Sequence, residues 1–381
     1  MTTLLLLAQT QVHPVVQVLV AAAAACVLMA VLAALLLVAE RVLVNYGTCT
    51  IDVNQGKETF EIEGGESLLA SLKSQNIFIP SACGGRGTCA YCKVKILDGG
   101  GPVTPTEEPL LTSEEIADQV RISCQVKVRN DMKIQIPEEL FAIQAFRGRV
   151  ERIRDLTHDI KEVRIELIEP ETIDFIPGQY IQLEAPPYGD NPESVYRAYS
   201  ISSVPSDKSH VEMIIRLVPG GICTTWVFEH LKEGDEVNLN GPYGEFRLSD
   251  DADRDMVWIA GGSGMAPFWS LVRHMKEQGI ERPCDYFFGA VSQRDLFLVE
   301  ELEQLAEELP WFRFVPALSG DDVGDWSGER GLITEAVGRN IEDGSNKEGY
   351  LCGSAGMIDA SIKVLESKGI TEQRIYYDKF N

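Results

Sequence analysis

The sequence lacks any run of lysine and arginine interleaved with aromatic residues. Such a run is the electrostatic footprint of a nucleic-acid-binding surface, and acidic residues here outnumber basic ones by 58 to 34. Nucleic acid is therefore excluded as a partner. The acidic surplus is better explained by a solvated surface than by a docking site for a basic protein, and by itself it decides nothing about function.

Charge is missing altogether from the first 39 residues, which contain no Asp, Glu, Lys or Arg. Within them, residues 18–39 form an unbroken apolar run that would span roughly 33 Å as a helix, against a hydrocarbon core of about 30 Å. A cleaved signal peptide would begin with basic residues and have a shorter apolar core. We therefore expect a retained transmembrane helix. The first charges, Glu40 and Arg41, are too few to set its orientation.

The cysteines do not form the even, regularly spaced set of a disulfide framework. There are nine, an odd number, and four of them fall within 42 positions: Cys83, Cys89, Cys92 and Cys124. This clustering indicates metal ligation and a reducing compartment for the soluble part of the chain. Four others have no partner in the sequence pattern and are interpreted as structural: Cys26, Cys49, Cys223 and Cys284.

The clustered cysteines have the spacing of an iron-sulfur ligand loop. ACGGRGTCAYCKVKILDGG followed by RISCQVKV gives C-x5-C-x2-C and a fourth cysteine after 31 residues. Gly84, Gly85 and Gly87 permit the backbone angles that let three thiolates in one loop surround two irons. A structural zinc site is the alternative, but it usually pairs two C-x2-C knuckles and only one is present. The pattern favours a 2Fe-2S cluster.

Hydrophobic periodicity divides the rest of the chain into three parts. Alternating stretches on both sides of an NQG turn predict a β-hairpin, and ESLLASLKSQN predicts a short helix after it. Short β-rich stretches broken by Pro and Gly recur over residues 147–248, which is typical of an antiparallel barrel. From residue 256, apolar strands alternate with helices and indicate a doubly wound parallel sheet.

Three short motifs have residues suited to nucleotide binding. RAYS at residues 197–200 offers a cation, an aromatic face and a hydroxyl, while GGICTTW at 220–226 offers a glycine-initiated helix start for a pyrophosphate. GGSGMAP at 261–267 places glycines at a strand-to-helix junction, where a helix N-terminus can approach the phosphates of a dinucleotide. Each motif is weak alone, and their order along the chain gives them weight.

That order, with GPYGEF and YLCG, resembles the ferredoxin-NADP reductase superfamily over residues 147–381, and the cysteine loop with its strand-helix frame resembles the β-grasp fold of plant-type ferredoxins. The resemblance implies that FAD is held by Arg197, Ala198, Tyr199, Ser200, Gly221, Ile222, Cys223, Thr224 and Phe380. It implies that NADH is held by Gly262, Ser263, Gly264, Pro267, Cys352 and Gly353. Ser200 and Cys352 would lie beside the reacting rings as the catalytic residues, with no nucleophilic role for Cys352. Ordinary packing remains the alternative for Cys352 and for Phe380.

Ferredoxin, flavin and nicotinamide modules occur in this order in reductase components of bacterial oxygenases and in the F subunits of sodium-translocating NADH:quinone oxidoreductases. The oxygenase reductases usually carry C-x4-C-x2-C and are soluble. This chain has C-x5-C-x2-C and an anchor, so it resembles the F subunits over nearly its whole length. Two features depart from that family: a shorter stretch between RAYS and GGICTTW, and a C-terminus reading DKFN instead of Asp-Phe-Gly-Gly.

The resemblance implies an NADH dehydrogenase subunit that transfers hydride from NADH to FAD and passes single electrons through the cluster to integral-membrane partner subunits. Four parts are expected: a transmembrane anchor (1–46), a β-grasp 2Fe-2S domain (47–143), an antiparallel β-barrel FAD domain (144–250) and a doubly wound parallel-sheet NADH domain (251–381). Because NADH is cytosolic, the soluble domains are expected on the cytoplasmic side of the inner membrane. NADH is expected over NADPH, although Arg294 lies where some relatives bind a 2′-phosphate.

Two alternatives remain open at the level of sequence. One is a membrane-tethered NADH-dependent reductase that feeds an oxygenase, and the other is a non-catalytic electron carrier or scaffold.

Overall fold

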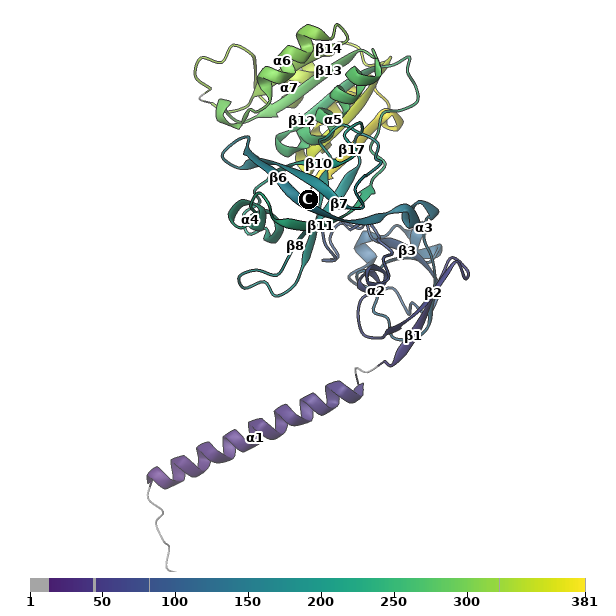
Figure 1. Cartoon of the computed structure of the whole chain (residues 1–381), viewed down its shortest axis with the longest axis vertical. Coiled ribbons are helices and arrows are strands. Elements are labelled where there is room, and N and C mark those ends of the chain that lie inside the picture. Colours follow the sequence, from purple (N-terminus) through teal and green to yellow (C-terminus); the bar gives the residue numbers. More distant parts are fainter. Residues whose placement is uncertain (1–13, 44–45, 82, 322, 381) are drawn as a thin grey trace, which may run out of the picture.

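The computed structural model describes residues 14–43, 46–81, 83–321 and 323–380. Helix α1 (Pro14–Leu43) stands apart from the folded domains (Figure 1). Its segment Val18–Leu35 is apolar and packs against nothing in the described chain. By length and composition, α1 is able to cross a membrane, as expected.

The domain after α1 is a mixed five-stranded sheet with a short helix packed on it. The strand order is β2-β1-β5-β3-β4, and β1 runs parallel to β5. Leu68 and Leu72 of α2 (Leu68–Ser74) are buried against the sheet, and the hydroxyl of Ser67 caps the helix by accepting from the amide of Ala70. The predicted β1–β2 hairpin is confirmed. The elements are β1 Thr48–Val53, β2 Glu58–Glu63, β3 Lys93–Asp98, η1 Glu108–Leu110, α3 Ser113–Ala117, β4 Val120–Ile122 and β5 Met132–Gln135.

The second domain is the predicted antiparallel barrel. Its strands follow the order β10-β7-β6-β11-β8-β9, and a bridge between Ile201 and Met213 joins the end of β9 to β10 and closes the sheet. The elements are β6 Gln144–Asp155, β7 Ile160–Glu169, β8 Tyr180–Ala185, β9 Val195–Ser200, β10 His210–Arg216, α4 Ile222–Glu229 and β11 Glu236–Tyr243. The short helix η2 (Glu138–Ala142) precedes them and packs on the core of the first domain through Leu140 and Phe141.

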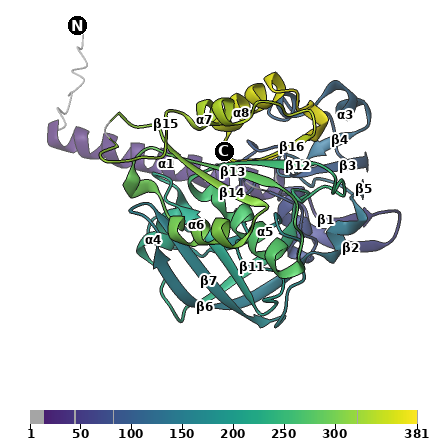
Figure 2. The same cartoon turned by 90° about the horizontal axis from the view of Figure 1, so that it is seen from above.

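The third domain is the predicted doubly wound sheet, with all strands parallel in the order β15-β14-β13-β12-β16-β17. Two apolar cores cover its two faces, with α5 and α6 on one side and α7 and α8 on the other (Figure 2). The elements are β12 Asp255–Gly261, η3 Gly262–Gly264, α5 Met265–Gln278, β13 Cys284–Ala290, η4 Gln293–Asp295, α6 Val299–Glu308, β14 Phe312–Leu318, β15 Glu329–Arg330, α7 Ile333–Asn340, β16 Lys347–Ser354, α8 Ala355–Ser367, η5 Glu372–Arg374 and β17 Ile375–Phe380. The order reverses between β12 and β16, where open sheets of this class bind nucleotides.

The barrel contacts both of the other folded domains. Against the ferredoxin-like domain it packs Tyr180 and Tyr243 onto Phe78. The ammonium group of Lys73 lies 3.4 Å from the ring centre of Tyr196. These contacts place the β9 side of the barrel against the cysteine-bearing domain.

Candidate functional site

The four clustered cysteines come together as two pairs. The thiol of Cys89 donates to the sulfur of Cys83 at 3.4 Å. Cys92 immediately precedes β3 and Cys124 follows β4, and the pairing of these strands brings the two thiols into hydrogen-bonding contact. The bond from Cys89 lowers the pKa of Cys83 to about 3, and the bond from Cys92 lowers the pKa of Cys124 to about 7. Each pair therefore brings two sulfurs together for metal ligation.

This arrangement suits two irons better than one zinc ion. Two thiolate pairs are what a 2Fe-2S cluster uses, because each iron takes two cysteines. Gly84, Gly85 and Gly87 all adopt positive φ angles (65°, 85° and 73°), as the loop was expected to need.

The RAYS motif forms most of β9 and presents a cation that no carboxylate pairs with among the described residues, together with a buried hydroxyl. The guanidinium of Arg197 donates only to the carbonyl of Tyr196, at 2.7 Å, and no carboxylate pairs with it among the described residues. Burial and the nearby charge of Arg86 lower the pKa of Arg197. The hydroxyl of Tyr199 is buried beside the thiol of Cys223, its one polar neighbour, and meets no nitrogen or oxygen partner among the described residues. An anionic cofactor with many polar atoms would satisfy both groups.

The second flavin motif, on helix α4, packs against strand β9, which carries the first. Helix α4 starts directly after Gly221, so the amides of its first turn are free to face an anion. Cys223 on this helix is buried, and burial raises its pKa to about 11, in agreement with a packing role. Thr224 turns its hydroxyl inward and donates to the carbonyl of Val218 at 3.3 Å. Ala198 and Ile222 contribute backbone to the same region.

The two nicotinamide motifs also come together. Gly264 lies so close to β16 that a β-carbon on it would overlap the carbonyl oxygen of Cys352, and it also touches Gly353. Pro267 is buried in the first turn of α5, and Ser263 lies in the turn before it. Burial raises the pKa of Cys352 well above its usual range, so this residue stays a neutral thiol, as a positioning role requires. Gly262 has a φ of 57°.

The last strand adds two residues to this region. Phe380 pairs with Ser354 in the register of β16 and β17 and is half-buried against the core that includes Cys352. Asp378 lies opposite Cys352 on the same strand pair. Burial raises the pKa of Asp378 to about 6, and its charge is close enough to affect Tyr91 in the cysteine loop.

Sequence reasoning missed Asp378 and Arg86. The signal for Asp378 was an acidic residue in the last apolar strand, IYYDKF. The signal for Arg86 was its place between two loop glycines. Neither was decisive, because what makes each residue notable is a neighbour distant in sequence.

Family models match the three folded parts in order. They are a 2Fe-2S iron-sulfur cluster binding domain over residues 47–129, an oxidoreductase FAD-binding domain over 147–248 and an oxidoreductase NAD-binding domain over 258–363. The predicted 2Fe-2S, FAD and NADH cofactors are thereby confirmed. Among curated relatives, the F subunit of the Na(+)-translocating NADH-quinone reductase of Pseudomonas paraeruginosa is 36% identical, covering 91% of this chain and 94% of the relative. That of Neisseria gonorrhoeae is also 36% identical, covering 91% and 95%.

The chain belongs to the family of F subunits of Na(+)-translocating NADH-quinone reductases. Solved structures agree with the arrangement of the folded domains. The Amycolatopsis cytochrome P450 reductase GcoB matches with a TM-score of 0.70 at 29% identity, covering 87% of this chain and 99% of that one. The ferredoxin reductase in carbazole 1,9a-dioxygenase matches with a TM-score of 0.67 at 26% identity, covering 88% and 99%. The three-domain body of this quinone-reductase component is thus shared with oxygenase reductases.

Proposed function

We propose that this chain is the NADH-oxidising subunit of a Na+-translocating quinone reductase, passing electrons to integral-membrane partner subunits. The observation that carries the proposal is the position of β9. Arg197 on this strand touches Gly84 of the cysteine loop, and the backbone just beyond Ser200 is hydrogen-bonded to α5, the helix that follows the nucleotide loop. One strand therefore connects the ferredoxin-like and nucleotide-binding domains.

In this proposal the cluster is held by four cysteines: Cys83, Cys89, Cys92 and Cys124. FAD is held by the motifs on β9 and α4, with Phe380 over its ring. NADH is held by the loop before α5, together with Cys352 and Gly353. When bound, FAD accepts a hydride and releases electrons one at a time. The chain's contribution is position. Gly84 packs on Arg197 and holds the cluster loop against the flavin strand, while the buried, neutral Cys352 keeps water and charge away from the nicotinamide position.

We assign the domain limits as 1–46, 47–143, 144–250 and 251–381, with α1 as a single-pass anchor in the inner membrane. The soluble domains lie on the cytoplasmic side, because that is where NADH is found. The apolar, unpacked Val18–Leu35 segment and the family membership support the anchor.

The deciding experiment is extraction from the native membrane in mild detergent, followed by identification of copurifying proteins and an assay of NADH-driven quinone reduction with and without sodium. We expect several multi-spanning subunits and stimulation by sodium. Copurification of an oxygenase would instead support the reductase alternative, since the cytochrome P450 reductase GcoB has a similar fold.

A further inference from the structure

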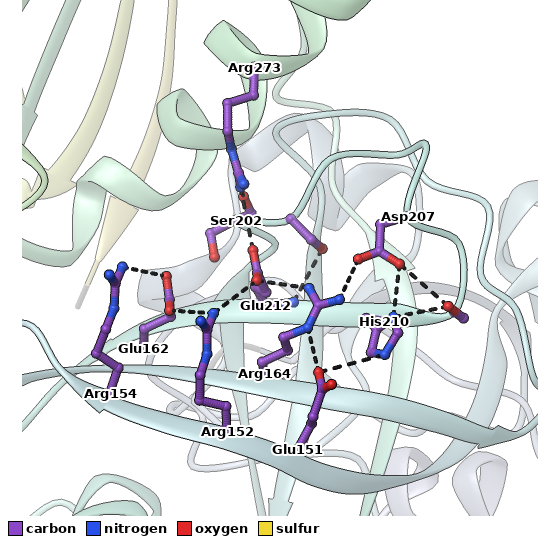
Figure 3. Close-up of polar contacts among 12 residues, drawn as sticks. Glu151, Arg152, Arg154, Glu162, Arg164, Ser202, Asp207, His210, Glu212 and Arg273 are labelled. Carbon is purple, nitrogen blue, oxygen red and sulfur yellow. Dashed lines mark hydrogen bonds and ion pairs between the residues drawn. The ribbon is translucent and has the colours of Figure 1, made fainter. Parts of the chain in front are cut away.

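Helix α5 follows directly after the nucleotide-binding loop. Its central residues are also hydrogen-bonded to the segment that continues strand β9, the strand of the RAYS motif. The hydroxyl of Ser270 donates to the carbonyl of Ser203 at 2.6 Å. One turn further along, the guanidinium of Arg273 donates to the carbonyl of Ser202 (Figure 3). Ser202 is two residues beyond Ser200, so one rigid helix links the NADH loop to the flavin strand.

The Ser202–Ser203 segment is itself fixed to the barrel. The amide of Ser202 donates to the carbonyl of Glu212 at 2.8 Å, and the amide of Glu212 donates to the hydroxyl of Ser203 at 3.2 Å. The segment therefore cannot follow α5 freely. Any rocking of the NADH domain on the barrel must break the bonds from Ser270 and Arg273.

Arg273 is held in one geometry by a partly buried ionic network centred on the buried carboxylate of Glu212. Its guanidinium lies 3.5 Å from a carboxylate oxygen of Glu212 and 4.5 Å from the ring centre of Trp269. Glu212 is buried and is also paired with Arg164 at 2.9 Å and with Arg152 at 3.5 Å (Figure 3). A buried carboxylate is costly unless it is paired, so positions of Arg273 that leave Glu212 with fewer partners are disfavoured.

We propose that Arg273, assisted by Ser270, is a positioning residue that sets the approach of the nicotinamide-binding loop to the flavin strand. This inference rests on the proposed function. NADH binding itself depends on the loop before α5, and electron exit depends on the barrel's contact with the ferredoxin-like domain. Arg273 touches neither, so its loss affects hydride transfer selectively.

The test compares Arg273→Met, Arg273→Lys and Ser270→Ala in the detergent-solubilised full chain loaded with FAD and cluster. In anaerobic stopped-flow experiments we expect Arg273→Met to lower the limiting rate of flavin reduction about ten- to a hundredfold, since small misplacements of reacting groups have effects of this size. The Kd for NADH and the rate of flavin-to-cluster transfer should stay within about twofold. Arg273→Lys should recover part of the rate.

The matched control is Arg152→Met, which removes a cation from the same carboxylate but leaves the bonds to α5 intact. We expect a wild-type limiting rate from it. A second readout is hydrogen exchange in FAD-free protein, where Arg273→Met should speed exchange over residues 201–204 and Arg152→Met should not.

An unchanged limiting rate in folded Arg273→Met overturns the inference, as does an equal loss in Arg152→Met. If Arg273→Met fails to retain FAD, Ser270→Ala decides the matter, because it removes one hydroxyl only; an unchanged rate and unchanged exchange there also overturn it. A wild-type chain that does not oxidise NADH at all contradicts the proposed function instead.

Discussion

Gly264 packs directly against the carbonyl of Cys352, so that two motifs far apart in the sequence of the NADH domain form one surface. A side chain at position 264 would push β16 away from the helix start. This close contact explains why glycine is needed at position 264, although its φ of −62° is one that any residue can adopt.

Gly264→Ala is therefore expected to destabilise the NADH domain by about 1 to 3 kcal/mol, the usual effect of overpacking, and to weaken NADH binding at least tenfold. Thermal unfolding and NADH titration measure the two effects. Gly338→Ala is the control, because its β-carbon would meet open space in helix α7. That variant should be neutral or slightly more stable, and equal losses in both would contradict the packing argument.

Cys89→Ser and Cys124→Ser should each abolish the 2Fe-2S absorbance and its paramagnetic signal, because each removes one ligand from a different pair. NADH should still bleach the flavin in both, since neither residue belongs to the FAD or NADH motifs. Metal analysis of the wild-type chain should find about two irons per chain. Stoichiometric zinc with little iron would contradict the cluster assignment.

Tyr199→Phe should separate FAD affinity from stability. The hydroxyl it removes is buried beside the weakly hydrogen-bonding thiol of Cys223 and meets no nitrogen or oxygen among the described residues, so the stability of FAD-free protein should change by no more than about 1 kcal/mol. FAD affinity should fall by about tenfold if that hydroxyl serves the cofactor. Calorimetry of the FAD-free chain and FAD titration give the two values. A loss of stability with unchanged FAD affinity would assign the hydroxyl to the fold.

Asp378 should make stability fall as pH rises. Its folded pKa, raised by burial to about 6, lies above the unfolded value of about 3.9, so the folded state binds the proton more tightly. The resulting stabilisation is complete below the unfolded pKa and is lost as pH rises through the folded one. Asp378→Asn should remove this dependence, with a gain relative to wild type of about 1 to 2 kcal/mol between about pH 5 and about pH 8. Thermal unfolding across that range measures it, and parallel curves would refute the assignment.

The sequence predicted most of the architecture because its signals are local. The hairpin of β1 and β2, the barrel strands and the parallel sheet follow from periodicity and turn residues over short windows. The cysteine spacing predicted the ligand loop for the same reason. The two-pair arrangement of the thiols, however, depends on β3 pairing with β4, a contact that spacing alone does not reveal.

The residues that sequence reasoning missed act across domains. Arg273 is an ordinary cation on an amphipathic helix until the barrel supplies Ser202 and Glu212 as its partners. Arg86 and Asp378 become notable only through Arg197 and Tyr91, which lie in neighbouring domains. Such partners are set by how domains dock, which no single-segment pattern records.

The connection from α1 to the first strand is short: four residues separate Leu43 from Thr48. A chain of that length reaches at most about 18 Å, so an inserted α1 confines the iron-sulfur domain to a thin layer over the bilayer. A partner subunit held in the same membrane complex would then meet the cluster at an effective concentration on the order of millimolar, set by this short tether. Electron delivery to such a subunit is then intramolecular, so its rate does not depend on the concentration of the chain in the membrane.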